Sequence, residues 1–339
     1  DLEILPKVTL NDIPRDHAYP EPIVTGSVTA YAAGCNGIVY HQLIRELPVL
    51  SDADWRLLPV LNQVAGELGF GHRDYVEAQN LQQSLTGGIS AFASVRASLG
   101  NVDQAGAFFV LSSRSLVRNA SKMMALLNET SQGLRFDETA RIAELVRQSN
   151  TRKQMGVVNQ GHSLAMLAAS AAFSKIAALN HQLSGLGSLA YFKGLVAGIA
   201  EGDVGSLAAD LASLYQRLQQ APQSAMLIAD EAELQGLIQA LLERGALTQA
   251  GPARQLIHAE QTALETAYVT ETEVNFCAAA YRCPSESSAT VAAVQVLAAI
   301  LRNQYLHAEI REKGGAYGGG ASYDAANGLF RFYSYRDPE

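Results

Sequence analysis

The chain has 339 residues, a formal net charge of −8 at pH 7 and 48% hydrophobic residues. Its anionic balance argues against a nucleic-acid partner, which needs clustered cations, and its apolar content excludes a disordered or fibrous protein. The longest apolar stretches, at residues 163–173 and 289–301, are shorter than the ~20 residues of a bilayer span. We therefore expect two buried helices there and no membrane partner.

The first 22 residues contain four of the ten prolines and show no helical or strand period, which predicts an extended linker over residues 1–22. Residues 23–32 and 37–40 are rich in β-branched and aromatic side chains. Turn-forming residues, with Gly34 and Gly37 among them, separate the two runs. This pattern predicts a strand pair.

Helical and strand periods then alternate along the chain. A helix with Leu61 and Val64 on its inner face should begin near Pro59, because proline is tolerated only in a first turn. Alternation at residues 89–95 and 107–113 predicts an antiparallel hairpin. The other helices expected in this part of the chain are residues 75–85, one starting at Asn119 or Ser121, and residues 137–147, 164–179 and 207–218.

A second cycle of similar order follows. It consists of a strand at 224–229, a helix at 234–242, a strand at 271–282, a helix at 287–305 and a hairpin over 318–335. The predicted fold is therefore α+β, with two related units that each have an antiparallel-rich sheet covered by helices.

The expected domains are the linker at 1–22, a first unit at 23–220 and a second unit at 221–339. Two helices follow the hairpin of the first unit, whereas none follows that of the second. We therefore expect the second unit to be truncated at its C-terminus and the chain to be part of a longer protein.

Zinc-peptidase helices carry H-x-x-E-H or H-E-x-x-H, because that spacing places two imidazoles and a base on one helical face. Neither motif occurs in this chain. The pairs His258/Glu260 and His307/Glu309 lack a second histidine one turn away, and the three cysteines form no C-x-x-C pair. We expect no metal site in this chain.

The run from Gly161 to Ala165 resembles the G-x-S-x-G nucleophile elbow. Two interpretations remain open for Ser163. A hydrolase nucleophile would need a strand at residues 155–158, whereas a helix N-cap needs only the helix that follows. The N-cap is favoured, because Asn159 and Gln160 interrupt the strand pattern.

The tract at residues 314–320 has more glycine than a turn needs, yet it lacks the spacing of a phosphate loop. Close backbone approach by a substrate is one explanation, with Gly314, Gly315, Gly318 and Gly319 as the candidate substrate-binding residues.

Arg311 and Tyr317 flank this tract as a fixed cation and a phenol donor. Such a pair could bind a peptide carbonyl or an oxyanion. Alternatively, Arg311 is only a favourable charge at a helix C-terminus.

Residues 311–324 read Arg-Glu-Lys-Gly-Gly-Ala-Tyr-Gly-Gly-Gly-Ala-Ser-Tyr-Asp. Together with residues 328–338, they resemble the C-terminal half of the presequence-protease branch of the insulinase (pitrilysin) family of zinc metallopeptidases. Residues 86–90 and the run Ile13-Pro-Arg resemble the same branch. The resemblance implies a clamshell of two halves around a chamber, with the zinc motif in the other, N-terminal half.

The resemblance also implies roles for this chain. Arg311 and Tyr317 match the arginine and tyrosine that assist the tetrahedral intermediate as catalytic residues. The implied function is the C-terminal half of a zinc-dependent endopeptidase that degrades unfolded or targeting-type peptides. Zinc is then a cofactor of the whole enzyme, bound by the N-terminal half, and this chain alone is expected to be inactive.

The expected partners are peptide substrates and the N-terminal half of the same protein. The resemblance leaves the location open, as cytoplasmic in a bacterium or an organellar matrix in a eukaryote. The alternative function is a non-catalytic peptide-binding or scaffold protein of the same fold.

Overall fold

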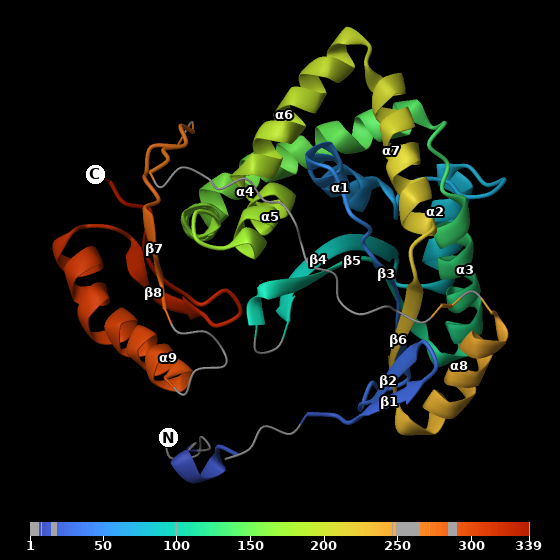
Figure 1. The fold of residues 1–339 in the computed structure, drawn as a ribbon, viewed down its shortest axis with the longest axis horizontal. Coiled ribbons are helices and arrows are strands. Elements are labelled where there is room, and N and C mark those ends of the chain that lie inside the picture. Colours follow the sequence, from blue (N-terminus) through green and yellow to red (C-terminus); the bar gives the residue numbers. More distant parts are fainter. Residues whose placement is uncertain are drawn as a thin grey trace, which may run out of the picture.

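The larger sheet determines the architecture of the chain (Figure 1). The computed structural model describes residues 7, 9–14, 19–98, 101–245, 247–248, 265–270, 272–283 and 290–338. In this part of the chain, six strands pair in the order β1-β2-β6-β3-β5-β4. Their bounds are β1 Pro22–Thr25, β2 Val28–Ala32, β3 Ile38–Glu46, β4 Ile89–Ser98, β5 Asn101–Leu116 and β6 Gln223–Ala229.

The strand pairing confirms an α+β fold but corrects the first predicted strand pair. Residues 22–32 form the β1–β2 hairpin by themselves, turning at Gly26, whose φ of 60° suits a tight turn. Strand β3 pairs instead with β5 and β6, both antiparallel. The predicted hairpin of β4 and β5 is confirmed.

Strand β6 belongs to the larger sheet and not to a second one, as its assignment to the second unit had implied. It pairs parallel with β2 and antiparallel with β3, although residues 47–222 separate it from β3 in sequence. Its alternating burial, with Ala225 and Leu227 covered, could not reveal which strands it joins. The division of the chain into units at residue 220 stays a prediction.

Helices cover one face of the larger sheet and enclose the main core. Leu58, Leu61 and Phe70 are at most 1% exposed, as are Met123 and Leu211. Burial of such side chains contributes about 1.5–3 kcal/mol each. The bounds are α1 Asp52–Val64, α2 Tyr75–Leu85, α3 Ala120–Gly133, α4 Thr139–Ala171, α5 Lys175–Ser184, α6 Leu186–Glu201, α7 Val204–Gln219 and α8 Glu231–Glu243, with short turns η2 Leu10–Asp12 and η3 Val117–Asn119.

Helix α1 begins earlier than the sequence analysis expected. The Ser51 hydroxyl accepts the Asp54 N–H at 3.2 Å, and the Asp54 carboxylate accepts the Ser51 N–H at 3.0 Å. This capping box fixes the N-terminus, so Pro59 lies inside the helix and is buried. The capping residues, and not the proline, determine where the helix starts.

Helix α4 extends from the larger sheet to the smaller one. It merges two helical runs across a break at Gln160, whose φ and ψ of −123° and 16° are not helical. The predicted helix at 164–179 is therefore divided between α4 and α5. Helix α6 was not predicted, because its apolar residues are interrupted by glycines and show little periodicity.

Residues 175–201 are the one described stretch whose length and composition would suit a bilayer span, with a hydropathy of 1.3. The stretch consists of α5 and α6, which meet at Gly185, where φ and ψ of −87° and −161° are extended. Both helices pack against α4 and against each other.

The smaller sheet has the described order β7-β9-β8, all antiparallel. Its strands are β7 Ala278–Arg282, β8 Gly318–Asp324 and β9 Leu329–Tyr335, and its helices are α9 Val291–Ile300 and the π-helical η4 Leu301–Lys313. The hairpin predicted at 318–335 is confirmed. The predicted strand at 271–282 is shorter than expected, and residues 271 and 287–289 of the predicted elements lie outside the described residues.

Two helices pack on opposite faces of the smaller sheet. Phe330 and Ala321 contact Ala298 of α9, whereas Tyr335 lies against His162 of α4. Helix α9 is not buried as expected, because only its inner face meets the sheet. Three of its large apolar side chains, Val296, Leu297 and Ile300, are 59%, 47% and 46% exposed.

Candidate functional site

The candidate site is built where η4 ends and β8 begins. The Gly314 N–H donates to the Glu309 carbonyl at 3.0 Å, and the Ala316 N–H donates to the Ile310 carbonyl at 3.2 Å. These bonds satisfy carbonyls at the helix end. Gly315, with a φ of 78°, then reverses the chain into the strand.

This turn brings the two predicted catalytic side chains together. The Arg311 guanidinium carbon lies 5.4 Å from the centroid of the Tyr317 ring, within the range of a cation–π contact. Arg311 is exposed and Tyr317 is 62% exposed. Their N–H and O–H donors are therefore accessible to a ligand.

The neighbouring strand β9 holds Tyr317 in place. The Tyr317 N–H donates to the Arg336 carbonyl at 3.2 Å, and its ring meets the Tyr335 ring edge-on at a centroid distance of 5.8 Å. The Arg336 guanidinium lies 5.5 Å from the Tyr335 ring. Edge-to-face and cation–π contacts of this kind fix ring orientation.

Helix α4 supports this cluster from the other side, which the sequence analysis missed. The His162 ring lies 4.8 Å from the Tyr335 ring, edge-on, and the Phe276 ring packs so closely on Gly161 that a Cβ there would overlap it. Burial lowers the pKa of His162. Gly161, which permits this close approach, was the only sequence signal.

The four candidate substrate-binding glycines have structural reasons within this chain. A Cβ on Gly319 would lie 2.6 Å from the Ile310 Cγ2, and one on Gly314 would lie 2.8 Å from the Ile310 carbonyl oxygen. Gly315 needs its positive φ, whereas a Cβ on Gly318 would make only a 4.0 Å contact. The close approach to Gly314 and Gly319 is thus made by the chain's own helix, and substrate binding by these glycines stays a prediction.

Ser163 is not a nucleophile elbow. Residues 155–158, which would have to form its strand, are helical, and Ser163 lies inside α4 beyond the break at Gln160. The N-cap interpretation is also wrong, because the residues before Ser163 already belong to the helix. Its hydroxyl lies 3.3 Å from His162 Nε2, and no strained turn presents it.

The described residues include no group of three or more His, Cys, Asp or Glu side chains placed to hold a metal ion. His307 Nδ1 lies 3.5 Å from a carboxylate oxygen of Glu312, and both side chains are exposed. His258 and Glu260 lie outside the described residues. The residues that the structure describes therefore do not fit a zinc site.

The fold is shared with solved structures of the peptidase M16 class. A structure titled as a peptidase M16 inactive domain from Pseudomonas fluorescens aligns with a TM-score of 0.56 and 16% identity, covering 94% of this chain and 75% of that chain. A conserved protein from Enterococcus faecalis V583 aligns with a TM-score of 0.60 and 15% identity over the same shares.

Family models identify the chain further. The model of the region associated with peptidase M16, subgroup C, matches residues 1–195, and the chain belongs to this family. The model "PreP C-terminal domain" matches residues 265–339. These matches confirm the predicted resemblance to the C-terminal half of the presequence-protease branch.

Curated relatives agree with the family models. Mitochondrial presequence proteases of Xenopus laevis and Gibberella zeae are 28% and 29% identical over the whole of this chain. The chain spans about a third of their length, 36% and 35% respectively.

Proposed function

We propose that this chain is the C-terminal half of a zinc-dependent endopeptidase, in which Arg311 and Tyr317 stabilise the transition state of peptide hydrolysis. The observation that carries the proposal is the exposed pair itself, with the guanidinium carbon 5.4 Å from the ring centroid. The family membership of the chain supports it. Zinc belongs to the N-terminal half in this proposal.

The chemistry of the pair suits a developing oxyanion. As a peptide carbonyl becomes tetrahedral, its oxygen gains negative charge, which a guanidinium and a phenol O–H can both stabilise by hydrogen bonds. The supports of Tyr317 from Tyr335 and Arg336 hold this donor in place before the substrate arrives. Donors oriented in advance cost little reorganisation during the reaction.

The proposal extends to substrates and partners. The chain alone is inactive, and its partners are the N-terminal half and unfolded or targeting-type peptides. The net charge of −8 favours basic peptides. An organellar matrix is the proposed location if the source is a eukaryote, and the cytoplasm if it is a bacterium.

The test uses the protein that carries this chain together with its zinc-binding half. Tyr317→Phe should lower kcat by about 10²- to 10³-fold, as loss of one oxyanion donor does, while zinc content stays unchanged. Tyr305→Phe is the matched control, because Tyr305 is 60% exposed on η4 and makes no contact in the proposed site. A fully active Tyr317→Phe variant would remove the role assigned to this hydroxyl.

The same assay distinguishes the alternative function. A fluorogenic peptide that binds the unsubstituted two-half protein without being cleaved would indicate a non-catalytic peptide-binding or scaffold protein. Cleavage that depends on Tyr317 supports the peptidase.

A further inference from the structure

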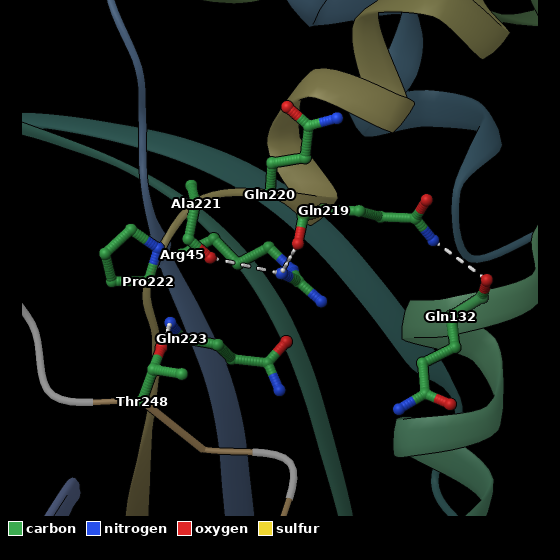
Figure 2. Close-up of a pocket in the computed structure, with 8 residues that line it drawn as sticks. All are labelled: Arg45, Gln132, Gln219, Gln220, Ala221, Pro222, Gln223 and Thr248. Carbon is green, nitrogen blue, oxygen red and sulfur yellow. Dashed lines mark hydrogen bonds between the residues drawn. The ribbon is translucent and has the colours of Figure 1, made fainter.

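A cavity of about 530 Å³ opens where the end of β3, the C-terminus of α7 and the start of β6 meet (Figure 2). Its polar lining is one guanidinium, four side-chain amides and one hydroxyl. These belong to Arg45, Gln132, Gln219, Gln220, Gln223 and Thr248. The size falls in the usual range for small-molecule sites.

The charge in this cavity is buried. Arg45 lies on the covered face of β3 and is only 8% exposed. Its Nη1 donates to the carbonyl of Gln219 at 2.9 Å and makes longer contacts with the carbonyls of Leu218 and Ala221, at 3.5 and 3.4 Å. One nitrogen of Arg45 therefore caps the C-terminus of α7.

The cap leaves two donors of Arg45 unused. No hydrogen bond joins Nε or Nη2 to the residues that the structure describes. Figure 2 shows the second terminal nitrogen pointing away from the α7 carbonyls, toward the space between the Gln223 and Gln132 side chains. The N–H groups of Nε and Nη2 lie side by side on one edge of the guanidinium, which is the edge that pairs with a carboxylate.

The electrostatics of the cavity favour an anion. No acidic side chain is among its lining residues in the described part of the chain. The full charge of Arg45 exceeds the partial charge of about −0.5 at the helix C-terminus. The surrounding amides can both donate and accept hydrogen bonds, which suits an amide group beside the anion.

We propose that this cavity binds a carboxylate with a neighbouring amide, the chemistry of a peptide C-terminus or an N-acylated amino acid. Nε and Nη2 of Arg45 hold the carboxylate in a bidentate pair, and the glutamine amides contact the amide group. The proposal does not depend on the proposed peptidase function, because its test measures binding and not hydrolysis.

The test compares N-acetylglycine with N-acetylglycinamide, which has the same shape and no charge. Each is titrated into the full chain and followed by calorimetry and by the arginine Nε–H resonances. N-acetylglycine should bind with a Kd on the order of 1 mM and shift one Nε–H resonance, whereas the amide should bind at least about 10-fold more weakly. Equal binding of the two probes, or binding of neither, would overturn the proposal.

Two variants separate the ligand role of Arg45 from its capping role. Arg45→Lys keeps a charged donor for the α7 carbonyls but removes the planar fork, and should weaken N-acetylglycine binding about 10-fold. Gln220→Glu places an anion at the cavity from an exposed position, so it should weaken binding similarly without touching the cap. Gln216→Glu makes the same change at an exposed position of α7 outside the cavity, and should bind like the unsubstituted chain.

The source of the carboxylate is resolved by further probes. A tripeptide with a free C-terminus should bind as tightly as N-acetylglycine or more tightly if the natural ligand is a peptide end, and more weakly if it is an acylated amino acid. If inorganic phosphate binds as well as N-acetylglycine, the cavity selects charge alone, and the proposed carboxylate recognition is wrong.

Discussion

Acidification should destabilise the chain through His41, a buried histidine in the middle of β3. Its side chain is 0% exposed, Nδ1 lies 3.3 Å from the Met226 carbonyl, and Nε2 is buried without a hydrogen-bond partner. Protonation would place a charged N–H at Nε2 where no acceptor meets it. Burial, offset by the Met226 carbonyl and reinforced by Arg244, lowers the pKa of His41 from 6.5 to about 4.

The direction follows from the two pKa values. Between pH 4 and pH 6.5 the unfolded chain binds a proton at His41 that the folded chain does not. This stability is therefore complete above pH 6.5 and is lost as the pH falls toward 4. The lowered pKa is equivalent to about 3 kcal/mol in total, of which about 2 kcal/mol is already lost at pH 5.

Urea unfolding at pH 8, 6.5 and 5 measures this effect. His41→Gln keeps a donor for the Met226 carbonyl but cannot titrate, so the unsubstituted chain should lose about 2 kcal/mol more than the variant between pH 8 and pH 5. Other titrating groups are common to both proteins and cancel in the difference. His72→Gln, at an exposed histidine, is the control and should follow the unsubstituted chain. Parallel curves for His41→Gln and the unsubstituted chain would refute the reasoning.

Three further outcomes are expected. Gly319→Ala pushes a methyl group into the side chain of the facing helix η4 and should cost about 1–3 kcal/mol in urea unfolding, whereas Gly318→Ala, where there is room, should change stability by less than about 0.5 kcal/mol. Tyr215→Phe removes a buried 2.9 Å hydrogen bond to a backbone carbonyl and should cost about 1–2 kcal/mol, and an equal loss for exposed Tyr40→Phe would contradict this reason. A fluorophosphonate should leave Ser163 unmodified in intact-mass measurements, and stoichiometric labelling there would contradict its helical setting.

Local sequence signals predicted the elements that depend on neighbouring residues. Helix α2 has the predicted bounds, and Asp74 and Glu77 form its capping box. The two hairpins β4–β5 and β8–β9 follow period-2 alternation broken by turn residues. Helix α1 was placed too late only because the proline received more weight than the capping box.

Features that depend on distant residues could not be predicted. Which strands β6 joins is decided by pairing with residues far away in sequence. The candidate site was predicted in part, since Arg311 and Tyr317 lie close together in the chain. The contact of His162 with Tyr335, and the burial of Arg45 beneath α7, arise only from tertiary packing.

The central place of β6 determines the order in which the chain can assemble. Strand β2 has only β1 and β6 as described partners, so the β1–β2 hairpin cannot join the rest of the sheet until residues 223–229 have left the ribosome. Long-range pairing of this kind is slow, and the waiting strand edges can associate with other chains in the meantime. A chaperone that shields β2 and β3 during synthesis would therefore raise the yield of folded chain more than one that acts after release.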